Sequence, residues 1–417
     1  MEQQEHPHRH DHSYSHSHNH DHVPNAAHPW SGHQDHEQRL TSRRDFLHML
    51  MGGALSGASF LEIAYHRAAW ARTATPAKRD ANLFDIQKAA NGVFFAQARP
   101  QTEVNCNAAI FVRSNDVVVV DAHSKPSAAA ALIAQIKREI TPNPVRYVVN
   151  THFHWDHTQG NHAYRAAGGP VDFIATSATK HLMSQLSVVR MKASVDAVPK
   201  QIEELRLRAE HATSEKEKAF CADEISHLKA YQAEMKDFTL ELPTITFDKS
   251  YVVQDRAFDM HLEFHGHAHT AGDLFVFCPQ QRAIATGDAC IGWIPNLADG
   301  FPKSWPRTLD EVAQADFKYV LGGHGPLQSD RTIMTNQRNY IEELTSRVEQ
   351  AKESGLSIEE MQKRFTVASL GSLRANGYGE YLTKSMAAGQ PHFGEARPLQ
   401  DGVNRNIGDI YKNLDRL

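Results

Sequence analysis

Short apolar runs between turn signals dominate the chain from residue 81 to residue 330. Runs such as 117–123, VVVVDAH, predict buried strands. Residues 127–140 instead have helical spacing and end before Pro142 and Pro144, which predicts a helix. Strands with interleaved helices are typical of an α/β layer architecture. The predicted strands are 92–98, 108–114, 117–123, 145–154, 171–177, 244–253, 259–266, 273–279, 282–290 and 318–326.

Two other segments have a predominantly helical pattern. Residues 178–238 are charged and nearly free of glycine and proline, and their apolar residues recur at helical spacing, which predicts a helical insertion folded as a hairpin. Such an apolar stripe is usually a packing surface, and a lid or a dimer arm is the alternative. Residues 331–417 predict a helical C-terminal extension with a loop near 387–398. The stripe residues are Ile202, Leu205, Ala209, Ile225, Leu228, Met235 and Phe238.

The segment 41–71 has the order of a twin-arginine export signal. Arg43 and Arg44 precede an uncharged apolar run, and an A-x-A-like site ends at Ala71. The apolar run is shorter than the ~20 residues that a membrane-spanning helix needs. We therefore expect a partner in the twin-arginine translocase and a periplasmic location, with membrane anchoring if the signal is not cleaved. An amphipathic helix with two chance arginines is the alternative.

A histidine-rich tract precedes this signal, within residues 1–40. Eleven of the chain's 27 histidines lie before residue 37. The tract has no apolar periodicity, which predicts disorder. Imidazoles in such a tract bind zinc, nickel or copper loosely, so it is either a metal reservoir or a spacer. We favour the spacer, because cleavage of the signal would remove the tract.

Composition narrows the class of protein further. The 417 residues are 41% hydrophobic and 22% charged, which is typical of globular proteins. A net charge of -5, without a basic patch interleaved with aromatics, argues against nucleic acid as a partner. The four cysteines are far apart in the chain and form no CxxC pair, so a disulfide framework is not expected.

The stretch THFHWDHTQG, residues 151–160, holds a dense set of metal donors. In an extended strand His152 and His154 point to the same side, because the side-chain period is two. His157 is out of that phase, so a turn is expected to carry Asp156 and His157 toward a neighbouring point. The spacing therefore predicts two adjacent metal positions. Carboxylate donors without cysteine are typical of a catalytic site rather than a structural zinc site.

Further donors follow predicted strands and lie beside glycine. They are His267 or His269 in HAHTAGD, Asp288 in TGD and His324 in GGHGP. Each alone is more often a solvated or turn residue than a ligand. Their joint occurrence, in order and at strand ends, favours a shared metal site.

These motifs resemble those of the metallo-β-lactamase superfamily from about residue 90 to 330, which predicts a catalytic domain over residues 81–330. The resemblance implies an αββα sandwich of two mixed sheets flanked by helices, with metals at one edge. His269 is chosen over His265 and His267 because it directly precedes TAGD. Asp121 in VVVVDAH would orient the ligands. By position, the resemblance gives His152, His154 and His269 to a first zinc, Asp156, His157 and His324 to a second, and Asp288 to both.

The resemblance implies hydrolysis of a small-molecule ester, thioester, lactone or amide-like bond. Two Zn²⁺ ions can share a hydroxide, which is a nucleophile at neutral pH, and Asp156 would help to orient it as the catalytic residue. Trp293 and Phe301 are candidate pocket walls, with packing as the alternative. The alternatives are a periplasmic β-lactamase, with Cys290 near the bridge, a dioxygenase of sulfur compounds with one Fe²⁺, and a non-enzymatic periplasmic metal-binding protein.

Overall fold

The computed structural model describes residues 83–99, 106–236, 238–389 and 398–416. The predicted histidine-rich tract and twin-arginine signal lie outside these residues, as does most of the loop predicted near 387–398. No helix in the described part of the chain combines the length and the apolar character that crossing a membrane requires.

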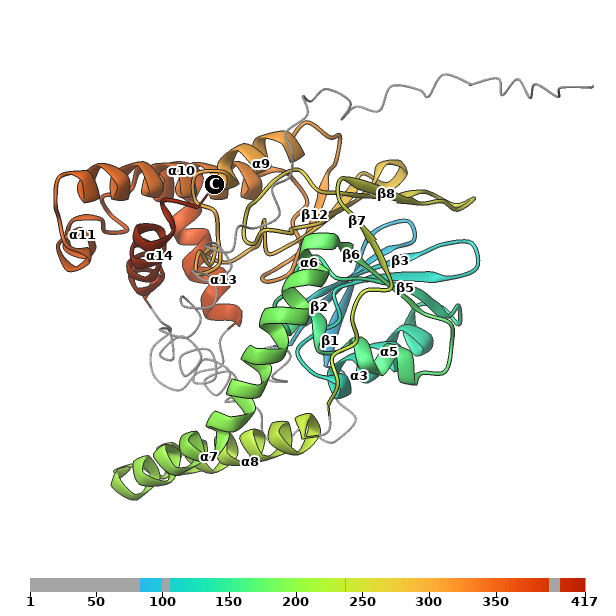
Figure 1. The fold of residues 1–417 in the computed structure, drawn as a ribbon, viewed down its shortest axis with the longest axis horizontal. Helices are drawn as coiled ribbons and strands as arrows, with labels where there is room; N and C mark the ends of the chain where they lie inside the picture. Colours follow the sequence, from blue (N-terminus) through green and yellow to red (C-terminus); the bar gives the residue numbers. More distant parts are fainter. Residues whose placement is uncertain (1–82, 100–105, 237, 390–397, 417) are drawn as a thin grey trace, which may run out of the picture. The chain divides into compact units, whose positions relative to one another are not determined.

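Seven strands form the first sheet, in the order β1-β2-β3-β4-β5-β6-β7 (Figure 1). Strands β1 to β4 pair antiparallel, and β4 to β7 pair parallel, so the sheet is mixed. The sequence pattern did not reveal β1, an edge strand whose interior positions are mostly exposed or half-buried. The strands are β1 (Phe84–Ala90), β2 (Val93–Ala98), β3 (Ala108–Val112), β4 (Val117–Val120), β5 (Val145–Val149), β6 (Asp172–Thr176) and β7 (Ile245–Phe247).

The second sheet has five strands in the order β12-β11-β10-β9-β8. Only β11 and β12 pair parallel. The prediction of one strand over 244–253 was wrong, because a bend at Asp248 and Lys249 divides it into β7 and β8, which belong to different sheets. The strands are β8 (Ser250–Val253), β9 (Met260–Glu263), β10 (Phe275–Cys278), β11 (Ala283–Gly287) and β12 (Tyr319–Gly322), with the 3-10 turn η3 (Pro279–Gln281) after β10.

The four valines of β4 show how the layers are built. Val118 and Val120 belong to the core cluster that joins the two sheets, with Val276 of the second sheet. Val117 and Val119 point to the opposite face and pack in a separate cluster with helical residues. Both faces of the strand are therefore covered, which explains an apolar run without alternation. The helices on the outer face are α3 (Pro126–Glu139) and α5 (Asn161–Ala166).

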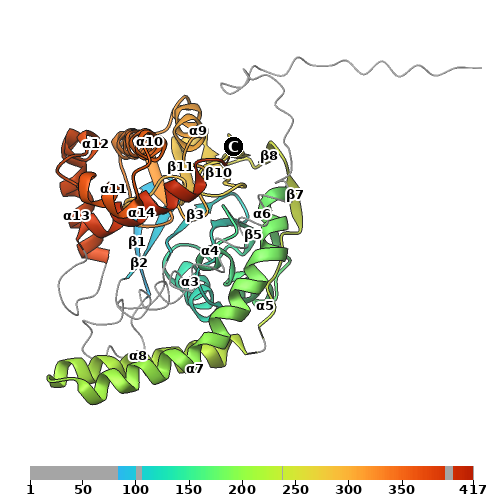
Figure 2. The same ribbon diagram turned by 60° about the vertical axis from the view of Figure 1, so that its left-hand side comes forward.

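The predicted helical insertion lies between β6 and β7. Its two long helices pack side by side and are paired in both views (Figures 1 and 2). Their shared interior includes Leu205, Phe220 and Cys221, which are buried. Its elements are α6 (Ser177–Leu182), the π-helical turn η2 (Met183–Ser187), α7 (Val188–His211) and α8 (Glu215–Met235).

Helices also form the predicted C-terminal extension. Two of their side chains make hydrogen bonds to the backbone of the loop that follows β11. Gln337 accepts a hydrogen bond from the Ile291 amide and donates one to the Ala289 carbonyl. Asn413 donates to the carbonyls of Leu297 and Ala298. The helices after β11 are α9 (Trp305–Val312), α10 (Thr332–Glu353), α11 (Ile358–Arg364), α12 (Gly371–Arg374), η4 (Ala375–Gly377), α13 (Tyr378–Gly389) and α14 (Leu399–Asn413).

Candidate metal centre

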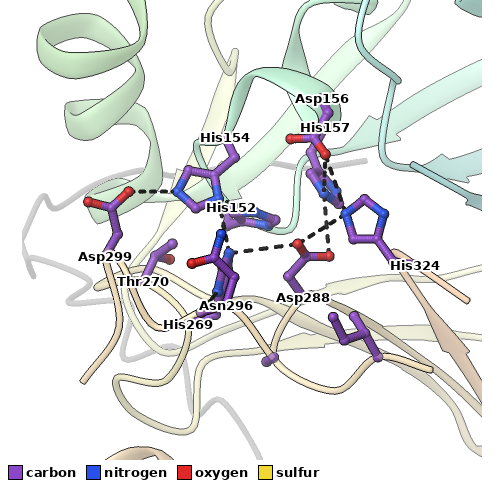
Figure 3. Close-up of polar contacts among 12 residues, drawn as sticks. His152, His154, Asp156, His157, His269, Thr270, Asp288, Asn296, Asp299 and His324 are labelled. Carbon is purple, nitrogen blue, oxygen red and sulfur yellow. Dashed lines mark hydrogen bonds and ion pairs between the residues drawn. The ribbon is translucent and has the colours of Figure 1, made fainter. Parts of the chain in front are cut away.

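Three imidazole rings converge at the edge of the sandwich (Figure 3). Nδ1 of His154 lies 3.1 Å from Nε2 of His152 and 2.9 Å from Nε2 of His269. Two donors of a tetrahedral zinc ion lie about 3.3 Å apart, given Zn–N bonds of about 2.0–2.1 Å. These nitrogens are therefore spaced much as the ligands of one ion, and we name the three residues the first group.

The other ring nitrogen of each first-group histidine has a partner that faces away from the group. A carboxylate or a carbonyl can only accept a hydrogen bond, and the Thr151 hydroxyl already donates to Asp121, so each imidazole donates to its partner and its inner nitrogen keeps a free lone pair. The tautomers that a metal requires are thus set by the protein. The outer contacts are His152 Nδ1 with Thr151 Oγ1 at 3.0 Å, His154 Nε2 with Asp299 Oδ2 at 2.8 Å, and His269 Nδ1 with the Asn296 carbonyl at 2.9 Å.

Asp156, His157 and His324 form a second group of donors. Oδ2 of Asp156 lies 3.6 Å from Nε2 of His157 and 3.3 Å from Nε2 of His324. Asp156 and His157 lie in the short helix α4 (Trp155–Thr158), and His324 follows β12. The change from extended chain to helix carries these two donors away from the line of His152 and His154.

The expected strand over 145–154 is shorter than predicted. Strand β5 ends at Val149, and residues 151–153 form a bend, so His152 and His154 do not lie on a strand. They still face the same point, because the bend and the extended backbone of His154 before α4 keep the two rings side by side.

Asp288, directly after β11, touches both groups. Its Oδ2 lies 3.2 Å from Nε2 of His324 and 3.7 Å from Nε2 of His269. Its Oδ1 lies 3.4 Å from Nε2 of His157, and within the described chain neither of these two buried atoms has a hydrogen-bond partner. Buried polar atoms without a partner are rare and need an explanation. Ligation of a cation explains both, so the residues fit a metal pair.

Asp121 holds His157 of the second group in place through a hydrogen bond. Its carboxylate accepts hydrogen bonds from Nδ1 of His157 at 2.8 Å and from the amide and hydroxyl of Thr151 at 2.9 and 3.0 Å. The Asp121 backbone has φ 69, a left-handed conformation that aspartate tolerates better than most residues. A strained residue held by three hydrogen bonds is typical of a functional site.

Burial and charge act differently on the two groups. Burial lowers the pKa of His152, His154 and His269, so these imidazoles are neutral, as metal ligands must be. Burial also opposes the charged form of His324, but Asp288 and Asp156 outweigh it and raise the pKa of His324 to about 9. The metal-free second group therefore holds protons that a cation would displace.

Gly323 leaves room for this arrangement. A Cβ atom at this position would lie 2.3 Å from Oδ1 of Asp288 and 2.7 Å from Cε1 of His157. Any larger residue would push into both side chains. The GG of GGHGP is thus needed for the close approach of the backbone to the donors.

Several residues near the centre could not be predicted from the sequence. Asp299, Thr151 and Asn296 hold the outer nitrogens of the first group, and Arg190 of the insertion binds Asp299. Asp299 lies in the segment 291–301, between the candidate wall residues Trp293 and Phe301, but no periodicity or motif marks it. Such contacts arise between distant segments and leave no local pattern.

The aromatic candidates of that segment have different environments. Trp293 stacks on His324, with ring centroids 5.0 Å apart, and is half-buried beside the centre. Phe301 is buried in a cluster with Phe153 and Ala271, so it serves packing rather than a pocket wall.

Other alternative donors lie outside the first and second groups. Cys290 is not in any of them, and burial raises the pKa of its thiol to about 12. The four cysteines are all free and buried, which agrees with the expectation of no disulfide framework. His265 pairs with Glu263 at 3.1 Å, and the ring of His267 packs at a tilt against Phe301, which leaves His269 as the histidine of its motif at the centre.

Two mixed sheets flanked by helices, with clustered histidine and aspartate donors at one edge, define a layered α/β protein with a candidate metal centre. The profile described as the metallo-beta-lactamase superfamily matches residues 101–324. The chain belongs to this superfamily.

Among solved structures, the chain is similar to a metallo-beta-lactamase from Pontibacter korlensis, with 19% identity, a TM-score of 0.45, and coverage of 62% of this chain and 98% of that one. It is also similar to the metallo-beta-lactamase FIM-1 from Pseudomonas aeruginosa in the mono-zinc form, with 17% identity, a TM-score of 0.45, and coverage of 64% and 97%.

Proposed function

We propose that this protein is a binuclear zinc-dependent hydrolase of small molecules. The observation that carries the proposal is the position of Asp288, whose carboxylate contacts histidines of both donor groups. A carboxylate shared between two groups of three donors is an arrangement that suits two adjacent ions. His152, His154 and His269 would hold one ion, Asp156, His157 and His324 the other, and Asp288 both.

The donor set consists of imidazoles and carboxylates without thiolate, which suits catalytic rather than structural zinc. Bound zinc would supply Lewis acidity and an activated water molecule at neutral pH. Burial opposes ionisation of Asp156, but His157 and His324 lower its pKa, so the carboxylate is ionised. An ionised Asp156 can accept a hydrogen bond from a water molecule and orient it toward the substrate.

The substrate class is an ester, thioester, lactone or amide-like bond. Each of these bonds contains a carbonyl group. A carbonyl is the electrophile that zinc held by these donors would polarise. The half-buried Trp293, stacked on His324, offers an apolar surface beside the centre for the rest of the substrate.

Metal analysis and a substrate panel test the proposal. The purified protein should contain about two zinc ions per chain, and activity lost with a chelator should return with zinc. The panel contains thioesters, lactones, aryl esters and the β-lactam nitrocefin. One iron per chain with oxidation of a sulfur compound would contradict the proposal, as would tight zinc binding without hydrolysis of any member. Hydrolysis of nitrocefin alone would assign the protein as a β-lactamase.

We further propose that the chain is exported by the twin-arginine translocase. The support is the Arg43–Arg44 pair before the apolar run. A variant with both arginines changed to lysine should remain in the cytoplasm, whereas Arg67→Lys should not alter export. N-terminal sequencing of the exported protein should begin near Arg72, and equal export of both variants would refute the proposal.

A further inference from the structure

Arg190, near the start of α7, makes an ion pair that reaches the metal centre. Its Nη1 lies 2.6 Å from Oδ2 of Asp299 and its Nη2 lies 2.8 Å from Oδ1, so the pair is bidentate. The same Oδ2 accepts a hydrogen bond from Nε2 of His154 at 2.8 Å (Figure 3). A chain of polar contacts thus joins the helical insertion to a donor of the first group.

Burial makes these contacts rigid. The side chains of Arg190 and Asp299 are 17% and 9% exposed, and that of His154 is 16% exposed. Charge-assisted, bidentate contacts with little solvent are stronger and better oriented than ion pairs at the surface. The carboxylate of Asp299 therefore has one favoured position relative to the imidazole.

Two further contacts hold the parts of this chain in place. The hydroxyl of Ser187, three residues before Arg190, donates to the Phe153 carbonyl at 2.7 Å, and the Arg190 guanidinium lies 5.3 Å from the centre of the Phe153 ring. Asn413 of α14 fixes the carbonyls of Leu297 and Ala298, directly before Asp299. The insertion and the C-terminal extension thus both fasten the surroundings of His154.

We propose that Arg190 and Asp299 are positioning residues for the metal ion of the first group, and that the helical insertion is a structural support of that ion. The inference rests on the proposed metal-binding function. Asp299 accepts a hydrogen bond from the N–H group at Nε2 of His154, which keeps the lone pair of Nδ1 directed at the point that His152 and His269 also face. Arg190 keeps the Asp299 carboxylate in the orientation that this contact needs.

An ion pair that only fastened the insertion to the sandwich would have a different effect. Its loss would lower the stability of the protein, but it would not change the affinity of one metal position relative to the other. Removing a carboxylate or its support behind a ligating histidine typically weakens metal binding by about 10–100-fold. The relative affinities of the two positions therefore separate the two roles.

The experiment uses the variants Asp299→Asn and Arg190→Gln in the full-length protein. The control is Arg208→Gln on the same helix, where Arg208 pairs with Glu217 at 2.9 Å away from the donors. Metal-free samples are titrated with zinc against a chromophoric chelator. Each substitution is also made in a His324→Ala background, in which the remaining strong site reports the first group. Thermal unfolding is measured on every sample.

Asp299→Asn should weaken zinc binding at the first group by about 10–100-fold and Arg190→Gln by about 10-fold, while Arg208→Gln leaves it unchanged. The affinity at the second group should stay within about threefold of the parent protein in all three variants. Unchanged binding in both test variants would overturn the inference. Equal weakening at both groups, or weakening in Arg208→Gln as well, would overturn it too. An unsubstituted protein that binds no zinc would refute the proposed function itself.

Discussion

Nδ1 of His157 lies 2.8 Å from Oδ2 of Asp121, a residue 36 positions earlier in the chain. The contact joins the end of β4 to the helix α4 and turns the second ring nitrogen of His157 toward Asp156 and Asp288. A histidine that donates to a buried carboxylate has a fixed tautomer and a more basic inner nitrogen. Asp121 would thus act on a metal through the residue that would bind it.

Asp121→Asn tests this relationship. The amide has the size of the carboxylate but not its charge, so it would hold His157 less well. We expect zinc affinity at the second group to fall by about 10–100-fold, as measured by chelator competition on the metal-free protein. The control Asp316→Asn removes a carboxylate that pairs with Arg282 at the surface. Equal affinities in the parent and in Asp121→Asn would show that the contact does not support a metal.

The residues that could be predicted from the sequence share one property: they follow strands. Strand ends meet at one edge of a layered fold, so donors such as His152, Asp288 and His324 were expected together although they are far apart in the chain. Short motifs at strand ends therefore carry most of the site. The apolar runs likewise indicated most of the strands, because both faces of the first sheet are covered by other layers.

What could not be predicted depends on contacts between segments. The run 244–253 has the pattern of one strand, and only the packing of two sheets divides it. Edge strand β1 has too few buried positions for an apolar signal. Arg190 and Asp299 are 109 positions apart, and neither lies in a motif. Their pairing follows from how α7 meets the loop after β11, which local propensity does not encode.

Gly323→Ala probes the close approach of the backbone to the donors. The added methyl would lie 2.3 Å from Oδ1 of Asp288, so the carboxylate or the strand must move. We expect loss of about one zinc ion per chain in metal analysis, with a smaller loss of thermal stability. Gly408→Ala is the matched control, because nothing lies within 4 Å of a Cβ atom at that position. Full zinc content in Gly323→Ala would mean that the site adapts to the methyl.

Asp288→Ala removes the carboxylate that both donor groups share. Hydrolysis of the best substrate from the panel should fall at least 100-fold in kcat/KM, an order of magnitude typical for loss of a preorganised catalytic charge. Zinc content should fall as well, because the two positions lose a common ligand. Asp310→Asn, which changes an exposed partner of Arg338, is the control. Activity near that of the parent protein would show that Asp288 is not the bridging residue.

The metal-free protein should lose stability at alkaline pH. Asp288 and Asp156 outweigh burial and raise the pKa of His324 to about 9, from about 6.5 in the unfolded chain. The protonated ring therefore stabilises the fold fully below pH 6.5, and this stabilisation is lost as the pH rises through about 9. The difference between these two pKa values corresponds to at most about 3 kcal/mol of the free energy of unfolding.

Urea unfolding of the metal-free protein at several pH values measures this loss. The free energy of unfolding should decline between pH 6.5 and 9 in the parent protein and decline less in His324→Asn, which has no titrating ring at this position. Bound zinc requires a deprotonated imidazole, so the zinc-loaded protein should show the shallower profile as well. Identical profiles for the metal-free parent and His324→Asn would mean that the carboxylates do not hold a proton on His324. In that case zinc binding at the second group would displace no proton from His324 between pH 6.5 and 9.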